Sequence, residues 1–367
     1  MRRIVHYYPA AMGHSGVSFA LWSWARAQAA AGFEVCVLHA PANDTGADVA
    51  FVSNEGRPGL TTMAIPHHGG HRLTLRPSSL GRYLGRDDLL VLHEGWIANN
   101  IVAAAAARRA GVPYVVMPHG VHEPAWTRYL KPPRWLRNQL ERQVLEGAAA
   151  VHVFFASEIP DIRTLAPRAG FVVVPTGFEI PDERWSGGGD YLAWIGRIDP
   201  HHKGLDLLIG AIAMLPRAER PVLRMRGYDY KDGLAALHRL VSRRDVARWV
   251  RLEEPVSGIE KSHFLREADG YVHPSRWECH SIALLENLAL GVPCLVSDAI
   301  HIAHTLRQSR AAVLSNPSEA SLATALLRLR QTSGEIARRG RELISAAFNW
   351  NVLMPQFQSC LGSLGLL

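Results

Sequence analysis

The chain has 367 residues, of which 48% are hydrophobic, and it carries a formal net charge of +7 with an isoelectric point near 9.5. That length is enough for two domains, each with a buried core. Charged residues make up only 20% of the chain and are spread along it, so the composition does not indicate a nucleic-acid-binding protein.

The cysteines and the apolar segments indicate where the protein resides. The four cysteines, Cys36, Cys279, Cys294 and Cys360, have no paired spacing and are expected to be reduced thiols. No apolar run approaches the roughly 18 residues that a membrane-spanning helix needs. We therefore expect a cytoplasmic protein, with peripheral contact at the inner face of the membrane as a further expectation.

The first half of the chain alternates strand and helix patterns. A strand at residues 3–8 leads through a glycine-bearing turn into an apolar helix at 17–31 and a second strand at 35–39. Gly16, at the start of that helix, lets the backbone come close to a ligand, although GHSG alone is a weak phosphate signal. Further strands are expected at residues 60–65, 89–92, 114–117, 150–153 and 171–174. This alternation predicts a parallel, doubly wound α/β sheet.

His119 lies in the sequence MPHG, directly after the strand expected at residues 114–117. A lone histidine is more often a structural residue than a catalytic one. The carboxyl end of a strand in an α/β sheet is nevertheless the usual place for a ligand, so both interpretations remain open.

A basic and aromatic stretch follows. Between residues 108 and 142 there are two acids, Glu123 and Glu141, against seven basic residues: Arg108, Arg109, Arg128, Lys131, Arg134, Arg137 and Arg142. Residues 126–136 add interspersed tryptophan, tyrosine and leucine. The pattern fits a helix pair packed on the sheet with a solvated basic face. It also fits a surface that binds anionic lipid or a lipid-linked acceptor.

Residues 181–190, PDERWSGGGD, are polar, contain three consecutive glycines and interrupt the alternation, which is typical of a linker. We therefore expect an N-terminal domain at residues 1–180 and a C-terminal domain at 191–347. A last amphipathic segment follows at residues 348–367.

The second domain begins with a strand at residues 191–195 and a helix at 205–215. Arg197 and Lys203 stand at either end of the loop between them. Each charge taken alone is equally compatible with a solvated surface. The adjacent His201 and His202 are interpreted as loop filler, because their adjacency argues against one chelating site.

Residues 271–298 read as strand, polar loop, helix and strand, with the helix at 281–290 closed by Gly291. Glu278 lies before the helix and Glu286 within it. The two carboxylates are spaced to hold two hydroxyl-bearing parts of one ligand above the helix start. The alternative is that Glu278 caps the helix and Glu286 is solvated.

The string PSRWECHSIALLENLALGVPCLVSD resembles the donor-site signature of retaining glycosyltransferases of the group 1 type (family 4). Seven positions fit that signature: Pro274, Ser275, Glu278, Leu285, Glu286, Gly291 and Pro293. Three depart from its commonest form: Cys279, His280 and Asn287. The first turn and helix, the His-Gly step at His119 and the Arg197 to Lys203 loop are similar to the same family.

The resemblance implies a GT-B fold, with two Rossmann-like domains facing a central cleft and a C-terminal helix that crosses back to the first domain. It implies transfer of a sugar from a UDP- or GDP-linked donor to an acceptor hydroxyl, with retention, in glycan, glycolipid or glycoconjugate synthesis. The donor is a substrate, and no cofactor is expected. The implied partners are this donor and a glycan or lipid-linked acceptor, without nucleic acid.

The resemblance also implies a role for each site residue. His119 and Glu278 contact the transferred sugar, Glu286 the ribose, and Gly16 the donor phosphates. Arg197 and Lys203 hold the diphosphate, whose negative charge grows as the glycosidic bond breaks. The implied catalytic residues are His119, Glu278, Arg197 and Lys203, and the implied donor-binding residues are Gly16, Arg197, Lys203, Glu278, His280, Ser281, Ile282 and Glu286.

Two other functions are weighed against this one. A catalytically inactive protein that only binds a nucleotide sugar would keep the same residues. A dinucleotide dehydrogenase is disfavoured, because no G-x-G-x-x-G follows the first strand. No Asp-x-Asp occurs in the chain, so we expect no metal at the diphosphate.

Overall fold

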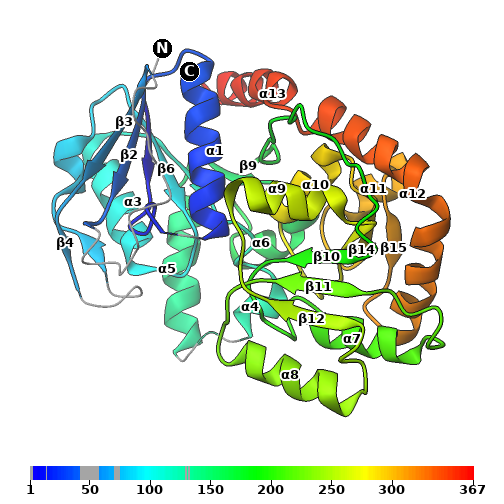
Figure 1. Ribbon diagram of the computed structural model, residues 1–367. Helices are drawn as coiled ribbons and strands as arrows, with labels where there is room; N and C mark the ends of the chain where they lie inside the picture. The colour runs from blue at the N-terminus through cyan, green and yellow to red at the C-terminus, as the bar shows by residue number, and fades with distance from the viewer. Residues whose placement is uncertain (1–2, 14, 42–57, 70–74, 129, 131–132) are drawn as a thin grey trace. The chain divides into compact units, whose positions relative to one another are not determined.

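The computed structural model describes residues 3–13, 15–41, 58–69, 75–128, 130 and 133–367. The chain divides into two compact units. The first unit comprises Met1–Gly177 and Trp350–Leu367, and the second comprises Phe178–Asn349. Each has its own parallel sheet, as the sequence predicts (Figure 1).

The first unit contains strands and helices in alternating order. Its elements are β1 (Ile4–Tyr7), α1 (Gly16–Ala30), β2 (Val35–His39), β3 (Leu60–Ala64), β4 (His67–His68), β5 (Arg76–Pro77), η2 (Leu80–Tyr83), β6 (Leu89–His93), α3 (Ala98–Ala110), β7 (Tyr114–Met117), α4 (Pro124–Thr127), α5 (Arg134–Glu146), β8 (Ala150–Val153), η3 (Ala156–Glu158), α6 (Ile159–Leu165), β9 (Phe171–Val173) and α13 (Trp350–Ser363).

The main sheet of the first unit has the order β3-β2-β1-β6-β7-β8-β9, and all its pairs are parallel. Strands β4 and β5 form a separate antiparallel pair. The strand order reverses between β1 and β6. Ligands of open α/β sheets bind at such a point, outside the carboxyl ends of the strands.

The two faces of this sheet have different chemistry. Val5, Tyr7 and Leu92 lie in an apolar core together with buried residues of α3, α5 and α6. Because side chains alternate along a strand, His6 and His93 lie on the opposite face. That face is covered by α1, whose Gln28 contacts His6.

The C-terminal helix α13 is part of the first unit. The ring of Trp24 on α1 meets the rings of Trp350 and Phe357 on α13 edge-on or tilted, with centroids 4.8 and 4.9 Å away. Gly177 lies against Trp350 so closely that a Cβ at this position would overlap the indole. Large buried aromatic residues dominate core energetics, so this cluster fixes α13 to the rest of the first unit.

The second unit has a six-stranded parallel sheet in the order β12-β11-β10-β13-β14-β15. Its elements are β10 (Leu192–Ile195), α7 (Leu205–Met214), β11 (Leu223–Arg226), α8 (Gly233–Arg243), β12 (Val250–Glu253), α9 (Gly258–Glu267), β13 (Gly270–His273), α10 (Ile282–Leu290), β14 (Cys294–Ser297), α11 (Ala303–Ser309), β15 (Val313–Ser315) and α12 (Glu319–Ala347).

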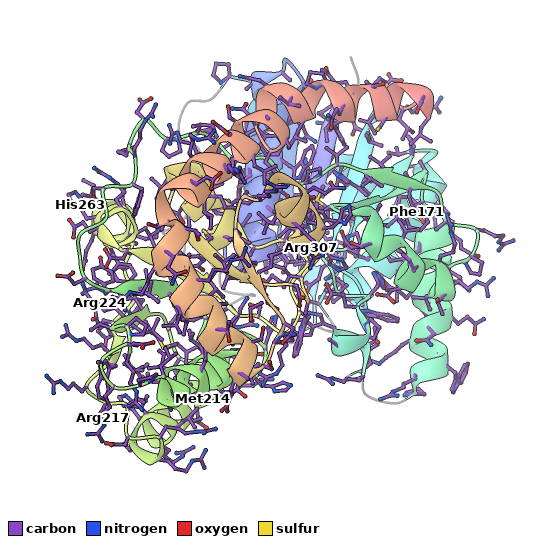
Figure 2. The ribbon with its side chains drawn as sticks, turned by 90° about the vertical axis from the view of Figure 1, so that its right-hand side faces the viewer. Phe171, Met214, Arg217, Arg224, His263 and Arg307 are labelled. Carbon is purple, nitrogen blue, oxygen red and sulfur yellow. The ribbon has the colours of Figure 1, made fainter. Side chains whose placement is uncertain are left out.

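One face of the second sheet is covered by α7, α8 and the first half of α12. Trp194, Met225 and Val272 of the strands pack there against Leu208 and Leu326 of the helices. Figure 2 shows α12, in orange, along one side of this unit, and it shows Met214 at the end of α7. The strand order reverses between β10 and β13, so the loops after these two strands flank the expected ligand position.

Residues 181–190, which the sequence predicts as a linker, lie within the second unit. Trp185 donates its backbone N–H to the carbonyl of Leu290 and its indole N–H to Ala268. Ser186, Gly187 and Gly189 donate to carbonyls at residues 266 and 267. The division between the units falls after Gly177 and again after Asn349.

Candidate donor site

The loop after β10 carries the two predicted cations. Arg197 packs its guanidinium over the ring of Tyr230, 4.2 Å from the centroid, and Lys203 follows six residues later, just before α7. The Nε–H of Arg197 is buried and has no hydrogen-bond partner in the part of the chain that the structure describes. An unpartnered donor on a permanent cation is what an anionic ligand would satisfy.

The loop after β13 lies directly against this first loop. Gly204 has a left-handed φ of 64°, and a Cβ there would overlap the carbonyl oxygen of Pro274. Only glycine fits that position without moving the backbone. The close approach places the ammonium of Lys203 2.9 and 2.7 Å from the two carboxylate oxygens of Glu278. The structure therefore joins two residues that are 75 positions apart.

His202 is a structural part of this site, and its interpretation as loop filler is wrong. Its ring stacks on Trp277 with centroids 4.5 Å apart, and its Nε2–H donates to the Trp277 carbonyl over 3.1 Å. Its Nδ1 accepts from Arg197 over 3.3 Å. The side chain is buried, and it links the loops after β10 and β13.

The charges at the site follow from these contacts. Burial and, after it, the positive charge of Lys203 lower the pKa of His202 to about 4, so the imidazole is neutral at pH 7. Burial of Glu278 alone would raise its pKa, but Lys203 and the nearby histidines outweigh this and lower it to about 2. Glu278 is therefore an ionised, acceptor-only group that can bind hydroxyls.

The remaining donor-site residues belong to α10 or the turn before it. Ser281 is the N-cap and accepts a hydrogen bond from the backbone N–H of Leu284, and Ile282 is the first helical residue. His280 lies with its ring 6.3 Å from that of Phe348. Glu286 forms a 2.7 Å ion pair with Lys261 of α9, and its side chain is only 18% exposed. It is therefore not the solvated residue of the alternative interpretation.

In the first unit, the predicted His119 has unusual backbone geometry. It adopts a left-handed φ of 55°, as do Glu94 at 69° and Trp96 at 62°, and all three follow the carboxyl ends of β6 or β7. Such non-glycine residues cost about 1–3 kcal/mol each and cluster at functional sites. His119 also receives a neighbour that the sequence did not predict, because its Nε2 lies 2.9 Å from Nδ1 of His93.

Gly16 is the first residue of α1, and Ser15 caps the helix by accepting from Ser18 N–H. An added Cβ at Gly16 would meet no atom of the described residues within 4 Å. Packing against those residues therefore does not require glycine here. His14, in the same predicted turn, lies outside the described residues.

The basic stretch exposes its apolar residues. Trp135 is 70% exposed, and Trp126 and Leu136 are each 39% exposed. Both acids of the stretch are buried, and Glu141 binds His122 and the backbone N–H of Trp96, each over 2.9 Å. Lys131 and Tyr129 lie outside the described residues. The surface of α5 thus combines exposed arginines with exposed apolar side chains.

Two kinds of feature are absent from the described residues. Within those residues, no three or more His, Cys, Asp or Glu side chains are grouped so as to hold a metal ion. No described helix combines the length and the apolar character that crossing a membrane requires.

The chain is similar to known proteins along most of its length. Residues 15–177 match the family described as Glycosyl transferase 4-like domain, and residues 189–332 match Glycosyl transferases group 1. A D-inositol 3-phosphate glycosyltransferase of Frankia alni is 30% identical over 236 residues, which are 56% of this chain and 57% of that protein. The match thus spans little more than half the length of this relative.

Solved structures share the fold. A sucrose-phosphate synthase of Thermosynechococcus elongatus superposes with a TM-score of 0.78 at 18% identity, covering 99% of both chains. HepE of Anabaena, in complex with UDP-glucose, gives 0.77 at 16% identity, covering 99% of this chain and all of that one. With two successive family matches and two parallel-sheet units, the chain belongs to the group 1 glycosyltransferases of the GT-B fold.

Proposed function

We propose that this protein transfers a sugar from a UDP- or GDP-linked donor to an acceptor hydroxyl, with retention of anomeric configuration, in the synthesis of a glycan, glycolipid or other glycoconjugate. The observation that carries the proposal is the meeting of Arg197, Lys203 and Glu278 at the carboxyl ends of β10 and β13. Two cations and an ionised carboxylate suit a ligand with a diphosphate at one end and hydroxyls at the other.

The proposed reaction uses these groups to bind and to neutralise charge. The bond between the anomeric carbon and the diphosphate oxygen breaks, and the acceptor oxygen bonds to the same face of that carbon. The acceptor proton passes to the departing phosphate. Arg197 and Lys203 stabilise the charge that grows on the leaving group. An ammonium has three donor hydrogens, so Lys203 can bind a phosphate oxygen without leaving Glu278.

The other site residues receive roles in the same proposal. Glu278 accepts hydrogen bonds from the donor sugar, Glu286 from the ribose, and the N-terminal turn of α10 at residues 280–282 supplies polar contacts. In the first unit, His119 contacts the transferred sugar and Gly16 leaves room for donor phosphates. A protein that binds nucleotide sugar without turnover is the alternative, and it has the same binding residues.

The test is a ligand screen followed by a transfer assay. Bound at 100 times its dissociation constant, a ligand stabilises the protein by roughly 2.7 kcal/mol, which raises Tm by about 5–10 °C. We expect UDP or GDP to give this shift and NAD to give none. The matching nucleotide sugars should then be hydrolysed or transferred, and NMR of the product should show retention. Nucleotide binding without any turnover would favour the inactive alternative.

We also propose that no divalent metal is needed. The chain has no Asp-x-Asp, the acidic pair through which many glycosyltransferases hold a metal on the diphosphate. Arg197, Lys203 and the amides at helix starts are proposed to replace it. Activity should therefore be the same, within error, before and after treatment with EDTA. Loss of activity that added manganese or magnesium restores would contradict this assignment of the phosphate site.

We further propose that the basic stretch from residue 126 to 142 guides an anionic or membrane-associated acceptor. Exposed Trp135 and Leu136 can enter a lipid interface, and each basic residue near an anionic leaflet contributes roughly 1 kcal/mol. The name of the Frankia alni relative, which includes a phosphorylated inositol, supports an anionic acceptor. A helix pair that serves only as packing is the alternative.

Vesicle sedimentation separates these two possibilities. The protein should bind anionic vesicles but not neutral ones, and salt should weaken the binding. Replacing Arg134 and Arg137 with glutamate should abolish it. The same change at Arg217 (Figure 2) and Arg330, which are exposed residues of the second unit, should have a much smaller effect. Equal binding to both vesicle types, or to neither, would contradict the proposed role of the basic stretch and would indicate a soluble acceptor.

A further inference from the structure

A row of hydrogen bonds runs from α1 through the first sheet to His119. The amide oxygen of Gln28 lies 2.7 Å from Nε2 of His6, and Nδ1 of His6 lies 2.9 Å from Nε2 of His93. Nδ1 of His93 lies 2.9 Å from Nε2 of His119. We call these four residues the histidine row. Gln28, His6 and His93 are fully buried.

The protonation of each imidazole in the row is fixed by its neighbour. Burial lowers the pKa of His6 to about 4 and that of His93 well below its usual value, so both rings are neutral at pH 7. A neutral imidazole has one nitrogen that donates and one that accepts. The direction of the whole row therefore depends on the group at its inner end.

That inner group is the carbonyl oxygen of Gln28, which can only accept. His6 must then carry its proton on Nε2 and accept on Nδ1. His93 in turn donates from Nε2 and accepts on Nδ1, and His119 donates from Nε2. In the neutral form of His119, this rule leaves Nδ1 without a proton.

We propose that Gln28 is a positioning residue that, through His6 and His93, holds His119 in the tautomer whose Nδ1 accepts a hydrogen bond. The proposal rests on the proposed function in one respect, the contact of His119 with the transferred sugar. The tautomer determines which sugar group can contact His119. The sugar group that meets Nδ1 is a hydroxyl that donates, and a carboxylate or carbonyl oxygen at this place is rejected because it can only accept.

The first test measures the tautomer directly and does not need activity. Histidines are labelled with 15N, and the ring resonances of His119 are identified by their loss in His119→Gln. The wild type should show a protonated Nε2 and an unprotonated Nδ1. In Gln28→Met, which removes the acceptor at nearly constant volume, both shifts should move toward an average of two tautomers. A protonated Nδ1 in the wild type would overturn the proposal, as would unchanged shifts in Gln28→Met.

The matched control is Trp24→Phe. Trp24 lies one turn earlier on the same helix, is fully buried, and donates one hydrogen bond to Thr176 outside the row. The Trp24→Phe variant should be less stable than the wild type, while the 15N ring shifts of its His119 remain those of the wild type. If Gln28→Met does not fold, His6→Leu breaks the row at the next position and should give the same change in shifts.

The second test uses transfer by the donor that the ligand screen identifies. Outer partners that orient a functional histidine typically contribute 10- to 100-fold, so we expect Gln28→Met to lower kcat/KM about 10-fold. In a His119→Phe background the same substitution should have no further effect, because the row then ends before the substrate. Equal losses in both backgrounds would show a purely structural role for Gln28. If no variant and no wild type has activity, the proposed function fails, whereas the tautomer test still stands.

Discussion

Replacing Lys203 with alanine should lower the rate of sugar transfer by on the order of 100-fold, the size of effect seen when one group that stabilises transition-state charge is removed. In the structure Lys203 binds both oxygens of Glu278 and lies on the same loop as Arg197. Its loss would remove a cation from the proposed diphosphate site and leave Glu278 without its main partner. Glu286→Ala should weaken donor binding more than the chemical step, because its proposed contact is with the ribose.

The measurement is steady-state transfer, with circular dichroism and Tm to show that the variants are folded. Arg244→Ala is the matched control, since it removes one cation and one 2.6 Å ion pair, with Glu319, from the same unit. It should retain wild-type kcat and KM. Wild-type activity in folded Lys203→Ala and Glu286→Ala would show that the donor site is elsewhere.

Acidification from pH 6.5 to 4 should strongly destabilise the protein. Burial lowers the pKa of His6, His152, His202 and His273 to about 4, and it lowers the pKa of His93 well below its usual value. In the unfolded chain these imidazoles become protonated near pH 6.5, whereas in the folded protein they become protonated only near pH 4. Stability is therefore full above pH 6.5 and falls as pH drops through that window, by roughly 2 kcal/mol per histidine at pH 5.

Three of these histidines lie in the first unit, so its Tm should be roughly 10 °C or more lower at pH 5 than at pH 7.5. His152→Leu should reduce the dependence of Tm on pH, even though loss of the bond to the Val174 carbonyl lowers Tm at pH 7.5. The exposed His238 serves as control, and His238→Gln should leave the pH dependence unchanged. A Tm that is constant from pH 7.5 to 5 would mean that these rings are not buried as neutral groups.

Much of the fold could be predicted because local patterns specify it. The apolar strand at residues 89–92 and the glycine that ends the helix at 290 are visible without any partner, and the structure places β6 and α10 within a residue of the expectation. The order of the strands in each sheet could not be predicted in this way. That β1 lies beside β6, or β10 beside β13, depends on contacts between distant residues that no local pattern encodes.

The same distinction applies to the site. Glu278 and Lys203 stood out as charges in polar loops, but their ion pair depends on how Gly204 meets Pro274. The role of His202 could not be predicted because its partner Trp277 is 75 residues away. His6 and His93 sit in apolar strands and resemble core residues in sequence, so only the register of β1 and β6 and the packing of α1 bring them into line with His119.

The packing of Trp350 and Phe357 against Trp24 has a consequence for dividing or recombining this protein. Because α13 belongs to the first unit, the second unit is in effect an insertion between residues 177 and 350 of the first. A fragment cut once after Gly177 would expose the apolar face of Trp24, so it should aggregate when expressed alone. A chimaera that takes its first unit from a relative must therefore import two segments, 1–177 and 350–367, whereas the second unit can be exchanged as one continuous segment.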